Sequence, residues 1–160
     1  MFSNILDILR LAATGAAFFF GYRIGFAGDS YHPEAQLHFM IPLLITVISG
    51  ISGLEGLLAG DRAARAKGYE TGSNYQRQSA FAMITLALVA VGVWLLNWGI
   101  QADLTIFFTF LIFHLLSGIN HAVDAVKRKN YSWQNINRPF LVLFLMAGMI
   151  YPVLMALKNL

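Results

Sequence analysis

Four long apolar stretches constrain the fold of this chain more than any other feature. They are residues 35–60, 79–99, 102–126 and 139–157. A helix needs about 20 apolar residues to cross the hydrocarbon core of a bilayer, so each stretch is long enough to span it. Charged side chains make up only 12% of the chain, about half of the share typical of soluble domains. The sequence therefore predicts an integral membrane protein with four transmembrane helices, and Pro139 is expected at the first position of the last one.

The N-terminal residues 1–28 hold a shorter apolar run and allow three interpretations. Polar side chains recur along one face of this segment: Ser3, Asp7, Arg10 and Thr14. That stripe is typical of an amphipathic helix lying at the membrane interface. A full span over about residues 5–27 instead leaves the charged groups near the two ends, where they can reach the headgroups. A signal peptide is the third interpretation, which Asp7 disfavours because the leading segment of such a peptide is basic.

We favour the inserted helix, and this choice completes the predicted fold. The fold class is all-α, a polytopic membrane helix bundle with four transmembrane helices plus a fifth, N-terminal one. The chain forms one domain over residues 1–160. It has no cysteine, which excludes disulfides and thiolate metal sites.

The basic residues predict how the chain is oriented. Eight of its eleven lysines and arginines lie in residues 61–78 and 127–138: Arg62, Arg65, Lys67, Arg77, Lys127, Arg128, Lys129 and Arg138. By the positive-inside rule, both segments are cytoplasmic and the C-terminus is outside. The net charge of +3 thus reflects membrane topology, and no nucleic-acid partner is expected.

Two ionisable side chains lie deep enough in predicted spans to indicate a function. Glu55 and His121 each lie six residues before a charged helix end, which places them about 9 Å into the bilayer at about 1.5 Å per residue. A polar face of about 160° surrounds His121 on its helix. The residues of this face are His114, Ser117, Gly118, Asn120, His121 and Asp124. The helix of Glu55 offers serines and glycines that allow close approach, so the two side chains are predicted to meet.

Amides near the same membrane face extend this cluster into a predicted ligand-binding pocket. Its residues are Glu55, Gln76, Gln78, His121, Asp124 and Asn137. Plainer interpretations stay open for residues in this region: Gln78 and Asn135 as helix caps, Arg138 as a headgroup anchor, Asp124 as a solvated charge at a helix end, and Glu55 with His121 as a pair that only fixes helix packing. His114 is expected to be a packed residue bonded to a carbonyl or a serine. No metal site is expected, because the bilayer segments hold a single glutamate and carboxylate-bridged metal bundles need several.

Several short motifs resemble those of DoxX-like bacterial membrane proteins, most closely an uncharacterised branch. They are Gly68-Tyr69, Tyr75-Gln76-Arg77-Gln78 and Gly118-Ile119-Asn120-His121, followed by Asn130 and Asn137. Gln78 stands where a glutamate is usual, which weakens a proton-transfer role there. The resemblance implies a four-helix bundle in a bacterial inner membrane. It also implies a link to quinones, because some DoxX-like relatives are membrane partners of quinone-linked oxidoreductases.

Two classes of function remain open. In the first, the pocket binds a small polar ligand, a lipid headgroup or a quinone, with His121 as the hydrogen-bonding group. In the second, the protein is a non-catalytic accessory or structural subunit, and its apolar faces bind a membrane partner protein or a second copy of the chain. A channel is disfavoured because the sequence has no internal inverted repeat. Neither a cofactor nor a reaction is indicated.

Overall fold

The computed structural model describes residues 2–66 and 70–160, and within these ranges the chain is helical apart from short connections. Five helices are long and apolar enough to cross a membrane. They cover Ile5–Gly25, Pro33–Leu58, Asn74–Leu95, Ile100–Lys127 and Asn135–Lys158. The predicted fold class, an all-α membrane helix bundle with a fifth, N-terminal helix, is therefore confirmed.

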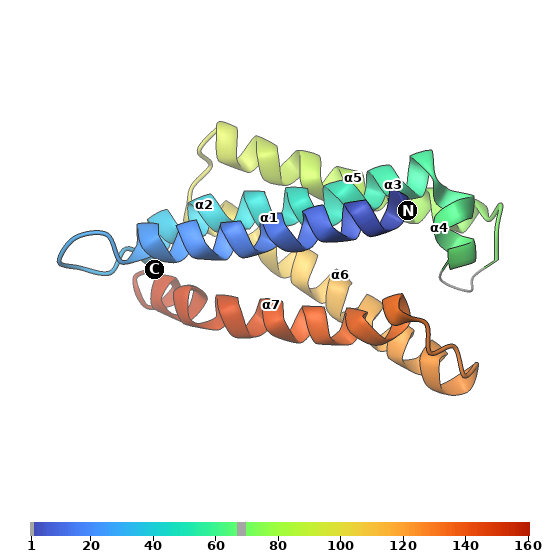
Figure 1. Ribbon diagram of the computed structural model, residues 1–160. Coiled ribbons are helices and arrows are strands. Elements are labelled where there is room, and N and C mark those ends of the chain that lie inside the picture. The colour runs from blue at the N-terminus through green and yellow to red at the C-terminus, as the bar shows by residue number, and fades with distance from the viewer. Residues whose placement is uncertain (1, 67–69) are drawn as a thin grey trace.

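The elements follow one another in the chain with tight connections between most of them. They are α1 (Phe2–Gly25), α2 (Pro33–Ile45), the π-helical turn η1 (Thr46–Gly50), α3 (Ile51–Leu58), α4 (Gly60–Ala66), α5 (Asn74–Leu95), α6 (Ile100–Lys127) and α7 (Trp133–Lys158). The turn between α5 and α6 uses positive φ at Asn97 and Gly99, a conformation that asparagine and glycine adopt most readily. Because these connections are short, consecutive long helices run antiparallel (Figure 1).

Both ends of the bundle can be followed in Figure 1. The N-terminus, α4 and the connection between α6 and α7 lie at one end, which we call the basic end because it carries Arg62, Arg65 and Arg128. The C-terminus, the α1–α2 loop and the α5–α6 turn lie at the opposite end. The two basic segments are thus on one side of the bundle, as expected. The compartment that this side faces stays a prediction.

The continuous helix formed by α2, η1 and α3 is the axis of the bundle. Half of its most apolar window is buried, against 11% for α1, and it packs on α1, α5, α6 and α7. The largest buried side chains come from it and from its neighbours α6 and α7: Leu37, Met40, Ile41, Leu44, Ile45, Phe107, Phe110 and Met149. Proline is rare inside helices, yet Pro42 lies inside α2 and the π-helical turn begins four residues later.

A glycine face brings α3 unusually close to α5. A Cβ atom added to Gly53 would lie 2.8 Å from the carbonyl oxygen of Ala80 and 3.1 Å from the backbone nitrogen of Ile84. A Cβ atom added to Gly56 would lie 2.9 Å from that of Ala80, and one added to Gly50, in the π-helical turn, would lie at an ordinary contact distance of 3.4 Å from that of Ala87. Small residues let membrane helices pack backbone against backbone. The sequence predicts that these glycines face the helix of His121, and the structure instead places them against α5.

The predicted helix boundaries are wrong at two places on the basic end. α7 begins at Trp133, so Pro139 lies inside the helix and not at its first position. α5 begins at Asn74, five residues before the predicted span. In both cases a polar first turn precedes the apolar run. Hydropathy marks the part of a helix that can cross the bilayer, and the helix itself continues into the polar boundary.

Candidate functional site

A cavity of about 520 Å³ lies at the basic end between two pairs of helices. α6 and α7 stay together but separate from α3 and α5 towards this end (Figure 1), and the cavity lies in the resulting V. Its polar lining comprises Ser52, Glu55, Glu70, Ser73, Tyr75, Gln76, Ser79, Ser117, Asn120, His121, Arg128 and Arg138. Its volume is within the range of about 300–1,000 Å³ that is usual for small-molecule sites.

The structure brings together half of the predicted pocket residues. Glu55 from α3, Gln76 from α5 and His121 from α6 all line the cavity. Asp124 and Asn137 are partly buried but do not line it, and the side chain of Gln78 is exposed on α5. The ligand-binding role of all six residues stays a prediction, and the three lining residues are the ones on which a binding hypothesis rests.

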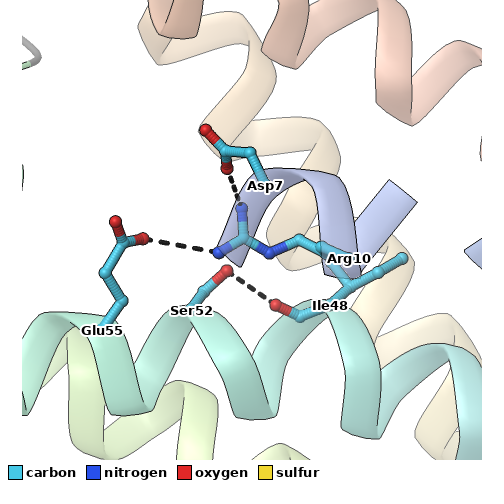
Figure 2. A network of polar contacts seen from close by, with 5 residues as sticks. All are labelled: Asp7, Arg10, Ile48, Ser52 and Glu55. Carbon is cyan, nitrogen blue, oxygen red and sulfur yellow. Dashed lines mark hydrogen bonds and ion pairs between the residues drawn. The ribbon is translucent and has the colours of Figure 1, made fainter. Parts of the chain in front are cut away.

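Glu55 has a partner that the sequence did not reveal. Its side chain is 3% exposed, and its Oε2 accepts a hydrogen bond from Nη2 of Arg10 at 3.4 Å. Nη1 of Arg10 also donates to Oδ1 of Asp7 at 2.6 Å (Figure 2). Arg10 therefore turns inward, its side chain 13% exposed, and does not extend to the headgroups as expected. Two carboxylates attract the guanidinium, and this triad fastens α1 to α3.

Ser52 lies one helical turn before Glu55, beside the Arg10 triad (Figure 2). Its hydroxyl donates to the carbonyl oxygen of Ile48 at 2.6 Å, an i to i−4 bond that reaches from α3 back into the π-helical turn. Such bonds satisfy a hydroxyl in an apolar setting. Ser52 lines the cavity with its donor already engaged.

His121 is held by a network at the junction of α6 and α7. Its Nδ1 lies 2.6 Å from Oδ1 of Asn135, which is 1% exposed. Nδ2 of Asn135 donates to Oδ2 of Asp124 and to the backbone carbonyl of Asn130, both at 3.1 Å. Arg128 forms an ion pair with Oδ1 of Asp124 at 3.0 Å. Asp124 thus links the last turn of α6 to the first turn of α7 through Asn135. The interpretation of Asn135 as a helix cap is wrong, because Ser132 occupies the N-cap position of α7.

A second hollow of about 760 Å³ lies next to the first and is lined by α4 and the start of α5. Arg62, Arg65 and Arg77 contribute to its lining. The two hollows share Gln76, whose Nε2 donates to the carbonyl oxygen of Gly60 at 2.6 Å. Gln76 therefore holds α4 against α5 as well as lining the candidate site.

Two further histidines lie outside this site. His114 is 9% exposed and its Nδ1 is 2.9 Å from the carbonyl oxygen of Phe110, which confirms the expected packed, carbonyl-bonded residue. His38 on α2 pairs with the buried Asp103 in the first turn of α6 at 2.9 Å, an interaction that the sequence did not predict. Across residues 2–66 and 70–160, histidines and carboxylates form no group of three that could hold a metal ion.

Comparison with known proteins gives one result. No curated protein and no solved structure matches the chain significantly. A family model, described as a family of unknown function (DUF6790), matches residues 5–159, nearly the whole chain. It neither supports nor opposes a DoxX-like relationship, and the Gly68-Tyr69 motif lies outside the described residues. The chain therefore belongs to DUF6790, a family of unknown function.

Proposed function

We propose that this membrane protein binds the polar head of an amphiphile, a lipid or a quinone, in the cavity at its basic end. The observation that carries the proposal is the cavity itself, which combines buried Glu55 with His121 and Arg138 beneath an opening between helices. Ionisable groups inside a membrane bundle mark functional sites by default, because their desolvation is costly. Nothing in the site requires a reaction, and the proposed activity is binding.

The shape of the bundle supports an amphiphile over a fully polar ligand. The cavity also has apolar lining, from Ala80 and Met83 on α5, and the exposed Leu116 on α6 is next in sequence to the lining residue Ser117. A bilayer would place acyl or isoprenoid chains against these surfaces. A molecule lying there can reach the cavity with its head while its tail stays in the hydrocarbon.

The charges of the cavity favour a head with oxygen acceptors. Two arginines, Arg128 and Arg138, and two glutamates, Glu55 and Glu70, line it. Glu55 is bonded to Arg10, and Arg128 is paired with Asp124. Guanidinium groups bind phosphate and other oxygen acceptors through directed hydrogen bonds. A phospholipid headgroup or a quinone head fits this requirement.

The orientation inferred from the basic residues completes the proposal. The cavity then opens towards the cytoplasmic leaflet of a bacterial inner membrane, whose anionic lipids attract the arginines near it. The resemblance to DoxX-like proteins is the reason for including a quinone among the candidate ligands.

Replacing His121 with asparagine tests the proposal with little risk to the fold. The amide nitrogen of asparagine can take the place of Nδ1 and keep the bond to Asn135, whereas the rest of the ring is lost from the cavity. We expect an at least tenfold loss of bound ligand, which corresponds to about 1.4 kcal/mol. Native mass spectrometry of the purified protein, combined with lipid and quinone extraction, measures the occupancy. His32→Asn, an exposed histidine near the opposite end, is the matched control.

The outcomes separate the candidate functions. A stoichiometric lipid or quinone that is present in the parent and in the His32→Asn control but lost from His121→Asn supports binding in the cavity. A parent protein that stays empty after reconstitution with phosphatidylglycerol and with a short-chain ubiquinone overturns it. The alternative, a non-catalytic accessory subunit of a membrane complex, would then be favoured.

A further inference from the structure

The second hollow at the basic end gathers arginines from two helices. It has a volume of about 760 Å³ and is lined by the end of α3, by α4 and by the start of α5. Arg62 and Arg65 are on α4, and Arg77 is in the first turn of α5. Three positive charges around one space repel each other. A bound anion would offset this repulsion.

These arginines have no carboxylate or aromatic partner among the described residues. Three arginines elsewhere in the chain are engaged: Arg10 by two carboxylates, Arg128 by one carboxylate and Arg23 by an aromatic ring. In the part of the chain that the structure describes, the side chains of Arg62 and Arg77 make neither a hydrogen bond nor an ion pair. Their guanidinium donors are therefore available to an anion in the hollow.

The charge of the lining determines which anion fits best. Asp61 is the one acidic residue among the described lining residues, so three positive charges and one negative charge leave a net charge of +2. Oδ1 of Asp61 already accepts a hydrogen bond from the backbone nitrogen of Gly72 at 2.9 Å. Its backbone carbonyl accepts a second one from Nε of Arg65 at 3.3 Å. A ligand group with a charge of −2 would neutralise this lining.

The walls of the hollow are held by bonds that do not involve Arg62 or Arg77. Nε2 of Gln76 donates to the carbonyl oxygen of Gly60 at 2.6 Å, which fastens α5 to the start of α4. The bond between Asp61 and Gly72 joins α4 to the segment before α5. The φ angle of Gly72 is +77°, a conformation that glycine adopts without strain. The hollow is therefore expected to keep its shape when Arg62 or Arg77 is replaced.

We propose that this hollow binds a phosphomonoester, a phosphate group that carries one organic substituent. Such a group has a charge of about −1.5 to −2 at pH 7 and three terminal oxygens. Guanidinium groups pair with these oxygens through charge-assisted hydrogen bonds. A phosphodiester such as phosphatidylglycerol carries a single negative charge and would leave half of the positive charge unopposed. The site is separate from the cavity of the proposed function and does not depend on it.

Two probes distinguish the possible sources of the phosphomonoester. Glycerol 3-phosphate is the soluble probe, and its binding to the full-length protein in phosphatidylcholine nanodiscs is measured by titration calorimetry. Phosphatidic acid is the lipid probe, and native mass spectrometry compares its retention with that of phosphatidylglycerol. Saturable binding of glycerol 3-phosphate, or a preference of about tenfold for phosphatidic acid, supports the proposal and identifies the source. Absence of both results overturns it.

Arginine variants test whether the hollow is the binding site. Arg77→Gln removes one charged donor and is expected to weaken binding of the phosphomonoester by about tenfold. Arg62→Gln is the second variant and is expected to act in the same direction. Arg23→Gln removes the same charge from the last turn of α1 and is the matched control, with unchanged binding. Parent-like affinity in both folded hollow variants would overturn the proposal.

An acidic variant is expected to change the affinity in the opposite direction. Asp61→Asn removes the negative charge of the lining, and its amide oxygen can still accept the hydrogen bond from Gly72. Affinity is expected to rise by about two- to fivefold. Asp29→Asn, in the α1–α2 loop at the opposite end, is the control. An unchanged or lower affinity in folded Asp61→Asn would contradict the proposed site.

The variant His121→Asn separates this site from the cavity of the proposed function. It is expected to lose the ligand of that cavity and to bind the phosphomonoester as the parent does. The variant Arg77→Gln is expected to show the reverse. Loss of the phosphomonoester in His121→Asn, with Arg77→Gln unchanged, would assign binding to the first cavity and overturn the proposal made for the second hollow.

Discussion

Replacing Arg10 with methionine is expected to lower the free energy of unfolding by about 3–5 kcal/mol, the cost of removing one partner of a buried ion pair. Glu55 is 3% exposed and lies in the candidate span that includes α3, so removing the Arg10 guanidinium removes a positive charge that stabilises its carboxylate. Methionine keeps the apolar stem and removes the charge. Denaturant titration in detergent, followed by circular dichroism, measures the loss.

A double-mutant cycle makes this result specific to the pair. In a Glu55→Gln background, Arg10→Met is expected to cost far less, because no buried carboxylate loses its partner. Arg23→Met, on the exposed face of the same helix, controls for the loss of an arginine and is expected to change stability by less than about 1 kcal/mol. Equal losses for Arg10→Met in both backgrounds would contradict the assigned role of the pair.

The substitution Gly53→Ala is expected to destabilise the bundle by about 2–4 kcal/mol, at the upper end of what overpacking costs. The added methyl group would lie 2.8 Å from the carbonyl oxygen of Ala80, and a backbone atom cannot move aside as a flexible side chain can. α3 and α5 must separate, which loosens one wall of the cavity. The midpoint of denaturant unfolding gives the change.

Gly92→Ala is the matched control because it introduces the same methyl group into α5. A Cβ atom at Gly92 meets no atom within 4 Å, so the helix only gains propensity and stability stays equal or rises by up to about 1 kcal/mol. Similar behaviour of the two variants would show that the α3–α5 contact is looser than the structure describes.

The sequence predicts the number and order of the spans because apolar length is a local property. Each run that is long enough to cross a bilayer is a helix in the structure. The glycines around Gly53 do indicate a close helix contact, but the neighbour is α5 and not the predicted helix of His121. The depth of Glu55 and His121, counted from the charged helix ends, also predicts that they share one region. Both line the same cavity.

Side-chain partners could not be predicted in the same way, because they depend on which helices become neighbours. Arg10 and Glu55 are 45 residues apart, and only the packing of α1 on α3 shows that they form a pair. The place of Asn135 just before an apolar run suggested a helix cap. Its side chain is instead buried and bonded to His121. Gln78 shares a short segment with Gln76 but lies on the exposed face of α5, a difference that depends on the rotation of the helix.

The most direct test of the account is to locate a bound amphiphile on the protein. A phosphatidylglycerol with a diazirine next to its head, or a ubiquinone analogue modified in the same way, is activated by light in proteoliposomes and its attachment sites are mapped by peptide mass spectrometry. The account predicts labelling concentrated on α5 and α6 at cavity residues such as Met83 and Ser117, and its loss in His121→Asn. Labelling spread evenly around the bundle, including Leu11 on the exposed face of α1, would contradict it.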